Sequence, residues 1–459
     1  MARSNPNGMA SDAERSAWLA AEVQTVLKRR VKDVRWDTLG FNNHLAFVNL
    51  EPIATSSNAS STGAELVDDV VVRIPRDKGS NANPALKIEN EVAALQLART
   101  HGILCPQILH WSHDPLYVVQ SKLPGTPTKE VWHTLSQQQQ AKFLRSLART
   151  LKRLRSIPLP TTPQAQYGGF RFDASPNSSS SSASAAKVTL GSNPLGFPGP
   201  SPALSASLRE FFDWQMSLAR KNEFIQGWTA KVADPPSFPF IGLSDRLRAF
   251  ADDQEKGLDK VLRDAELEAG RWGRPVFVHG DFDLHNTLID TDTFELTGIV
   301  DFEFARAAPA WAEHFDGFTA LGHVHYGPED DDEGTRKLGE ALLHPAGWSS
   351  ESNPIPPAEQ NGQVAGLSGD EPGDAVWWET VRAWDDACAA EGLGTPRAMG
   401  SAFATASRLH WFISDVCPWQ LEDAVSESAE LDEEERAAQL DRRERTARRL
   451  DRYLHFWGF

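Results

Sequence analysis

The feature of this chain that most constrains its fold is the segment from residue 275 to residue 303, which reads PVFVHGDFDLHNTLIDTDTFELTGIVDFE. Residues 276–278 have the composition of a buried strand, and they lead directly into His279-Gly280-Asp281. Asn286 follows five residues after Asp281. The predicted strand therefore ends in a polar loop that carries two oxygen-bearing side chains.

A short hairpin is predicted after this loop, with one arm near Leu288–Ile289 and the other from Phe294 to Val300. The second arm ends at Asp301, which lies 20 residues after Asp281. Because both aspartates follow strands and Asn286 lies between them, we expect the three side chains to converge at one end of a small sheet. Each of them alone is also explained as a turn residue, but the ordered set is not.

Three converging oxygen ligands indicate a particular chemistry. Hard oxygen ligands suit Mg²⁺, which keeps some of its waters and takes the rest of its ligands from substrate phosphates. A carboxylate that does not bind the metal can orient or deprotonate a hydroxyl. Phosphoryl transfer depends mainly on positioning and on charge neutralisation, so this segment predicts a phosphotransferase.

The pattern H-G-D-x-x-x-x-N followed by I-V-D-x-E resembles the signature of the aminoglycoside phosphotransferase and choline kinase family, which has a protein-kinase-like fold. The resemblance implies that Asp281 is the catalytic base and that His279 supports the catalytic loop. It also implies that Asn286 and Asp301 bind Mg²⁺, with Glu303 behind them. The nucleotide implied is ATP.

The resemblance extends upstream, to a basic residue on the third strand that binds the phosphates and a glutamate on the next helix that pairs with it. The segment VVVRIPR has Arg73 where many relatives have lysine. The planar guanidinium of arginine therefore replaces the compact ammonium group of lysine. A helix is predicted from Asn83-Pro84, and Glu91 shares its buried face with Ile88. A buried carboxylate needs a partner, and Arg73 is the natural one, whether its role is functional or only structural. Glu89 is the competitor and is expected nearer the solvent.

Two further nucleotide contacts are implied by the resemblance. The segment TLGFNNHLAFV contains no G-x-G-x-x-G and only one glycine, Gly40, but Asn42 and Asn43 can adopt the left-handed turn conformations that cover a phosphate. LYVVQSKLPG resembles the strand and linker between two lobes, where backbone groups from Ser121 to Leu123 would bind adenine.

Composition excludes several other classes of protein. The chain has 46 lysines and arginines against 63 aspartates and glutamates, a net charge of −17, which disfavours long nucleic acids and anionic membranes as partners. Its three cysteines form no CxxC pair, and no apolar run is long enough to span a bilayer. We therefore expect a cytoplasmic protein with no nucleic-acid, membrane or obligate protein partner.

The predicted architecture is α+β and bilobal. Residues 1–30 are expected to form a tail and a helix, residues 31–123 a small β-rich nucleotide-binding lobe, and residues 124–459 a larger, mainly helical catalytic and substrate-binding lobe. Two low-complexity stretches, 174–202 and 327–374, are expected to be disordered insertions. The remaining helices of the large lobe are predicted over residues 136–156, 204–226, 244–269, 376–391, 397–416 and 427–456.

Two functions are consistent with this sequence. The first is an ATP- and Mg²⁺-dependent phosphotransferase acting on a hydroxyl of a small molecule, for which an acidic pocket would favour a cationic substrate such as an amino sugar or choline. The alternative is a catalytically weak pseudokinase that acts as a scaffold, suggested by the single Gly40, by Arg73 in place of lysine and by the two insertions. His323 and His325 lie near Glu313 and Asp316 in the sequence, but this set matches no metal motif, and a place in the pocket wall is expected.

Overall fold

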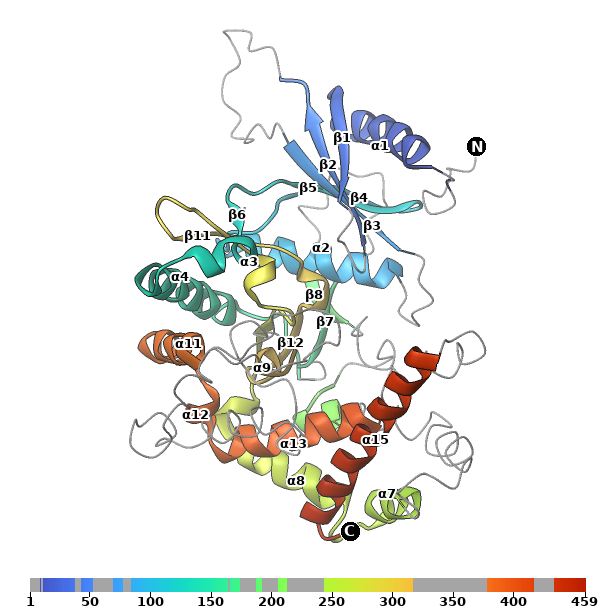
Figure 1. Ribbon diagram of the computed structural model, residues 1–459, viewed down its shortest axis with the longest axis vertical. Helices are drawn as coiled ribbons and strands as arrows, with labels where there is room; N and C mark the ends of the chain where they lie inside the picture. Colours follow the sequence, from blue (N-terminus) through green and yellow to red (C-terminus); the bar gives the residue numbers. More distant parts are fainter. Residues whose placement is uncertain are drawn as a thin grey trace.

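The computed structural model of the chain describes residues 9, 11–37, 43–52, 69–76, 84–163, 166–173, 187–191, 205–212, 243–316, 378–416 and 433–459. As Figure 1 shows, a small β-rich lobe at the N-terminal end lies above a larger, mainly helical one. Residues 275–303 lie in the upper part of the large lobe, where they face the small lobe. This is the predicted α+β, bilobal architecture.

The small lobe is built on one antiparallel sheet with the strand order β1-β2-β3-β5-β4. Its strands are β1 (Val31–Asp37), β2 (Asn43–Leu50), β3 (Asp69–Pro75), β4 (Ile108–His113) and β5 (Leu116–Ser121). Side chains alternate between the two faces of such a sheet. Helix α1 (Asp12–Leu27) covers one face and buries Leu19 and Val23 against Val70 and Val72.

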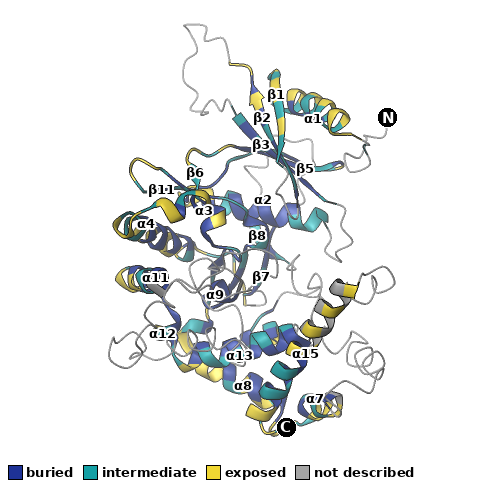
Figure 2. Cartoon of the chain, viewed as in Figure 1, coloured by how far each residue is buried: buried dark blue, intermediate teal, exposed yellow. Residues whose placement is uncertain are grey.

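The opposite face of this sheet carries Arg73, which is paired across strands with Val118. Val118 packs in the same apolar core as Ile88, Val92 and Leu95 of helix α2 (Pro84–Thr100). The predicted helix and its buried face are confirmed. Figure 2 shows α2 as one of the most deeply buried helices, lying between the sheet and the large lobe. The alternation of β3 therefore directs Arg73 toward α2 and the site.

The upper part of the large lobe contains two small sheets. One has the order β11-β10-β6, from β6 (Thr126–Pro127), β10 (Thr287–Ile289) and β11 (Leu296–Ile299), so the predicted hairpin is confirmed. The other has the order β8-β7-β12-β9, from β7 (Gly168–Phe172), β8 (Val188–Gly191), β9 (Pro275–Val278) and β12 (Arg306–Pro309). β9 leads into the catalytic loop, and β12 pairs with it.

Helices surround these sheets. They are α3 (Thr128–Val131), α4 (Gln137–Arg155), α7 (Leu243–Asp252), α8 (Leu258–Ala269), α9 (Ala312–Asp316), α11 (Trp378–Ala390), α12 (Pro396–Met399), α13 (Ser401–Val416) and α15 (Glu433–Phe456). Short 3₁₀ turns are η2 (Trp132–Thr134), η4 (Gly270–Gly273), η5 (Leu284–Asn286) and η6 (Phe302–Phe304). Among the helices of the described part of the chain, none is long and apolar enough to cross a membrane.

The structure corrects the prediction that residues 174–202 are entirely disordered. Residues 188–191 form strand β8, which pairs with β7 through Phe170 opposite Leu190 and Phe172 opposite Val188. Leu190 is buried in the main core. The stretch was misjudged because the short segment Val-Thr-Leu-Gly was averaged with its Ser- and Pro-rich neighbours. The second predicted insertion, residues 327–374, lies outside the described residues.

Two predicted helices are each divided. Residues 244–269 form α7 and α8, because the Asp253 side chain accepts hydrogen bonds from the backbone N–H groups of Glu255 and Lys256 and starts a turn. A Cβ at Gly257 would lie 2.1 Å from the backbone oxygen of Phe250, so the turn requires glycine. Residues 397–416 are divided at Gly400, which has φ +56°. Of the helix predicted over 204–226, the structure describes only residues 205–212.

Candidate active site

The loop after β9 is held by a buried carboxylate. The backbone N–H groups of His279 and Gly280 each donate to Glu313 of α9, at 2.9 Å to Oε2 and 2.9 Å to Oε1. Glu313 is 0% exposed. Gly280 has φ +83°, and a Cβ there would lie 2.5 Å from the backbone oxygen of Phe304. Glycine is therefore required at the point where the chain turns from the strand into the loop.

His279 joins this loop to the end of β11. Its Nε2 lies 3.0 Å from the backbone oxygen of Val300, and its Nδ1 accepts from the backbone N–H of Asp281 at 3.3 Å. These two contacts assign the proton of the ring to Nε2. Burial lowers the pKa of His279, against the nearby charges of Glu313 and Asp281, so the ring is neutral. The geometry is that of a support for the loop, as expected from the sequence.

Asp281 and Asn286 are brought together, as their spacing predicted. The Asn286 amide nitrogen donates to Asp281 Oδ2 at 2.7 Å and to the Asp281 backbone oxygen at 2.9 Å. Asp283 begins the intervening 3₁₀ turn η5, because its side chain accepts from the backbone N–H of Leu284. Among the residues that the structure describes, Asp281 Oδ1 has no hydrogen-bond partner. One carboxylate oxygen is therefore held and the other is available.

His285 is a site residue that the sequence analysis did not single out. Its Nε2 lies 3.2 Å from Asp281 Oδ2. Burial would raise the pKa of Asp281, but the hydrogen bond and charge of His285, together with His279 and Asn286, hold it below its usual range. Burial works against a charged His285, but Asp281 and the nearby carboxylates raise its pKa. Asp281 is therefore ionised at neutral pH.

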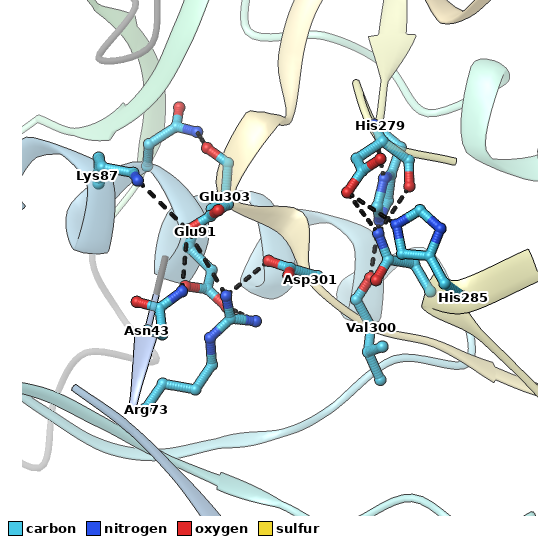
Figure 3. Close-up of polar contacts among 12 residues, drawn as sticks. Asn43, Arg73, Lys87, Glu91, His279, His285, Val300, Asp301 and Glu303 are labelled. Atoms are coloured by element: carbon cyan, nitrogen blue, oxygen red, sulfur yellow. Dashed lines mark hydrogen bonds and ion pairs between the residues drawn. The ribbon is translucent and has the colours of Figure 1, made fainter. Parts of the chain in front are cut away.

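A second group of side chains surrounds Arg73. Its guanidinium lies 2.6 Å from Asp301 Oδ1, 3.1 Å from Glu91 Oε1 and 3.6 Å from Glu303 Oε2. The predicted pairing of Arg73 with Glu91 is confirmed. Figure 3 shows Asp301 between this group and the His279 side of the site. The contact to Asp301 joins β3 of the small lobe to the end of β11.

Glu303 is the buried centre of the same group. Asn43, at the start of β2, donates to Glu303 Oε2 at 3.1 Å, and Lys87 of α2 lies 3.6 Å from the same oxygen (Figure 3). Asn90 of α2 donates to the backbone oxygens of Glu303 at 3.1 Å and of Ala305 at 2.9 Å. Both β2 and α2 are therefore fastened directly to the segment that follows Asp301.

The charges of this group are unbalanced, with three carboxylates against the cations Arg73 and Lys87. Burial opposes the charge of Arg73, but Asp301, Glu91 and Glu303 raise its pKa, so it stays protonated. Burial and the two neighbouring carboxylates raise the pKa of Glu91 against the effect of Arg73. An additional cation would therefore be favourable here.

The oxygen atoms needed for such a cation are present. Asn286 uses its side-chain amide nitrogen on Asp281, and within the described part of the chain neither its side-chain oxygen Oδ1 nor Asp301 Oδ2 has a hydrogen-bond partner. Asp301 has φ 64° and ψ 63°, a left-handed conformation that is uncommon outside glycine and is typical of functional sites. The donor chemistry fits Mg²⁺. The described residues contain no group of three or more His, Cys, Asp or Glu that could hold a metal by themselves.

The other predicted nucleotide contacts are only partly described. Gly40 and Asn42 lie outside the described residues. Ser121 ends β5, where its N–H donates to the backbone oxygen of Gln107 and its Oγ accepts from the Gln107 N–H, both at 2.9 Å. Leu123 packs closely against Gly298 of β11, where a Cβ would lie only 2.4 Å from Leu123 Cδ1. Their contact with a nucleotide stays a prediction.

One expectation from the sequence is wrong in its detail, and one contact was not expected. Glu89 does not lie nearer the solvent, since it is buried and accepts from the backbone N–H of Phe172 on β7 at 3.2 Å. It was misjudged because β7, which covers that side of α2, was not predicted. His323 and His325 lie outside the described residues, and Glu313 anchors the loop after β9, which the sequence analysis did not predict. Its position in an acidic run gave no signal of this role, which depends on a contact 33 residues away along the chain.

Comparison with known proteins gives a family match. The family described as the phosphotransferase enzyme family matches residues 53–350, which is more than half of the chain. No curated protein matches. Solved structures similar to the chain include an ADP-bound aminoglycoside phosphotransferase APH(2'')-Ib, with 13% identity, a TM-score of 0.45 and coverage of 96% of this chain and 99% of that one.

Two other similar structures are a type I macrolide 2'-phosphotransferase and a putative fructosamine-3-kinase from Thermobifida fusca. The first has 14% identity and a TM-score of 0.41, and the match covers 94% of this chain and 96% of that one. The second has 15% identity and a TM-score of 0.44, with coverage of 95% and 98%.

Proposed function

The chain belongs to the phosphotransferase enzyme family, and we propose that it transfers the γ-phosphoryl group of ATP, bound with Mg²⁺, to a hydroxyl of a small molecule. The observation that carries this proposal is the half-held carboxylate of Asp281. Its Oδ2 accepts two hydrogen bonds, while Oδ1 has no partner among the described residues. An ionised carboxylate with one available oxygen can orient an acceptor hydroxyl and take its proton.

The metal would be held by the side-chain oxygen Oδ1 of Asn286 and the carboxylate of Asp301. When bound, Mg²⁺ supplies the positive charge that phosphoryl transfer requires on the phosphate oxygens. Asn286 also holds Asp281, through two hydrogen bonds from its amide nitrogen. The same side chain would therefore set the spacing between the metal and the base.

Arg73 is proposed to hold the phosphates. Glu91 and Asp301 fix two of its terminal nitrogens, and its Nε has no hydrogen-bond partner among the residues that the structure describes. A buried donor without a partner is costly, and a phosphate oxygen would satisfy it. In the nucleotide complex Asp301 would turn toward the metal, and Arg73 would exchange that ion pair for a phosphate while keeping Glu91.

The remaining assignments complete the proposal. Residues 31–123 would form the nucleotide-binding lobe, in which backbone groups near Ser121 and Leu123 bind adenine. The turn with Gly40, Asn42 and Asn43 would cover the phosphates. Residues 124–459 would supply the catalytic loop and the acceptor site. Cys105 and Cys388 are buried thiols in the described part of the chain, which fits a reducing cytoplasm.

The test is nucleotide binding followed by transfer. Calorimetry with ATP and with GTP, each with and without Mg²⁺, should show Mg²⁺-dependent binding of ATP. A panel of hydroxyl compounds, including amino sugars and choline, should then contain at least one acceptor whose phosphorylation consumes ATP in equal amount. Binding of ATP that does not respond to Mg²⁺, with no transfer to any acceptor, would contradict the proposal and favour a scaffold function.

A further inference from the structure

His285 lies beside the proposed base and at the surface of the site. Its ring nitrogen Nε2 is 3.2 Å from Asp281 Oδ2. The side chain of His285 is 42% exposed and that of Asp281 is 26% exposed, whereas Asn286 is buried. The histidine therefore contacts the base from its solvent side, and Figure 3 shows it at the edge of the group, away from Arg73. The assignment above counts its hydrogen bond to Asp281 but gives the side chain no role of its own.

The contact fixes which carboxylate oxygen is available. Asn286 and His285 donate to the same oxygen, Oδ2, from two different positions on the loop. One hydrogen bond leaves a carboxylate free to rotate about its terminal torsion, which is broad and roughly two-fold. Two donors to one oxygen oppose that rotation and keep Oδ1 directed away from both of them. A base must hold its oxygen within hydrogen-bond reach of the acceptor hydroxyl, so this restraint matters for the reaction.

Neighbouring polar residues do not duplicate the restraint. Asp283 is buried, and its Oδ1 accepts from the backbone N–H of Leu284 at 2.6 Å, so it stabilises the 3₁₀ turn. His279 Nδ1 accepts from the backbone of Asp281 and does not touch its carboxylate. Within the described part of the chain, His285 and Asn286 are the side chains that donate to the carboxylate of Asp281.

We propose that His285 is a positioning residue, which holds Asp281 Oδ2 so that Oδ1 faces the acceptor hydroxyl. This proposal rests on the proposed function of Asp281 as the base. It concerns hydrogen-bond donation by Nε2 and requires no proton to be transferred to the ring. The competing explanation is that His285 is a surface histidine whose contact with Asp281 only stabilises the loop.

Two substitutions separate these explanations. His285→Leu removes the hydrogen-bond donor and leaves an apolar side chain of similar size. His285→Gln places an N–H donor, its own Nε2, at the same number of bonds from Cα as the histidine Nε2. His455, an exposed histidine near the end of α15, provides the matched control His455→Leu. The probe reaction is release of inorganic phosphate from Mg·ATP with water as the acceptor, since the natural acceptor is unidentified.

His285→Leu should lower the rate of phosphate release by about 10-fold or more, with unchanged affinity for Mg·ATP, because a hydrogen bond to a charged group is lost only at the base. His285→Gln should recover most of that rate, and His455→Leu should match the wild type. Equal losses in the Leu and Gln variants, a wild-type rate in His285→Leu, or a parallel loss of ATP affinity would each overturn the proposal.

Failure of the proposed function would give a different result. If the wild type releases no phosphate, the contact is read by nitrogen NMR of the histidine rings in the wild type and in Asp281→Ala. A shift of the His285 Nε2 signal between them supports the positioning contact by itself. An unchanged His285 signal overturns it.

Discussion

Replacing Glu313 by glutamine or alanine should destabilise the protein and slow the reaction together. Its two carboxylate oxygens accept the backbone N–H groups of His279 and Gly280, each at 2.9 Å, in a fully buried position. Glutamine keeps one acceptor and turns an NH₂ group toward the other N–H, so one buried donor loses its partner, at a cost of about 1–3 kcal/mol. Alanine leaves both donors without partners, which costs about 2–6 kcal/mol.

Arg155 makes the loss larger. Burial lowers the pKa of Arg155, and the charge of Glu313 is the main influence that opposes this. Without the carboxylate, the guanidinium of Arg155 keeps its hydrogen bond to the backbone oxygen of Ala310 but loses the charge that most favours its protonated form. Both variants lose this charge, so each should lose more stability than its unpaired backbone donors alone would cost.

Urea unfolding followed by tryptophan fluorescence gives the free energy of unfolding of each variant. The matched control is Glu255→Gln, because Glu255 is exposed and belongs to the turn between α7 and α8. The rate of phosphoryl transfer by Glu313→Gln should fall even where the variant is fully folded without denaturant. The reason is that the loop before Asp281 is no longer held at both His279 and Gly280. If the free energy of unfolding of the Glu313 variants stays within about 0.5 kcal/mol of the wild-type value, as for a surface substitution, this reasoning is refuted.

Three further predictions follow from the same contacts. Asp301→Ala should abolish Mg²⁺-dependent phosphoryl transfer while its circular dichroism spectrum shows an intact fold. If the variant turns over at the wild-type rate, Asp301 is not a metal ligand. Leu190→Ala on β8 should cost about 2–5 kcal/mol in urea unfolding, whereas a change near zero would mean that β8 does not belong to the core. Because burial lowers the pKa of His279, its ring stays neutral in the folded protein, while in the unfolded chain it gains a proton below about pH 6.5. Stability should then fall as the pH drops below 6.5, by at most about 1.4 kcal/mol per pH unit, and this slope should be smaller in His279→Asn; equal slopes would contradict it.

The parts of the site that follow from local spacing could be predicted from the sequence. Asp281 and Asn286 lie on one short loop, so their five-residue separation already limits how far apart they can be. Arg73 and Glu91 could be paired because strand alternation and helix periodicity place both on faces that must be buried. In each case the rule acts over one element or between two adjacent ones.

The parts of the site that depend on packing between distant elements could not be predicted from the sequence. The 2.6 Å contact of Arg73 with Asp301 joins residues 228 positions apart, and the sequence suggested Glu91 and phosphate, not an aspartate, as the partners of Arg73. Glu313 reaches the catalytic loop only because α9 follows β12, a strand of four residues whose composition gave no signal. Strand β8 was hidden for a related reason, since a short strand inside a polar stretch is recognised only by its partner β7.

The central claim, that Asp281 is the base, is tested most directly by single-turnover transfer from Mg·ATP in the wild type and in Asp281→Asn. The substitution is nearly isosteric: its carbonyl oxygen can keep the hydrogen bonds from Asn286 and His285, and an NH₂ group replaces the available Oδ1. The account predicts unchanged affinity for Mg·ATP and a rate lower by about 10²–10⁴-fold. A variant that binds ATP weakly but transfers phosphate at the wild-type rate would contradict it.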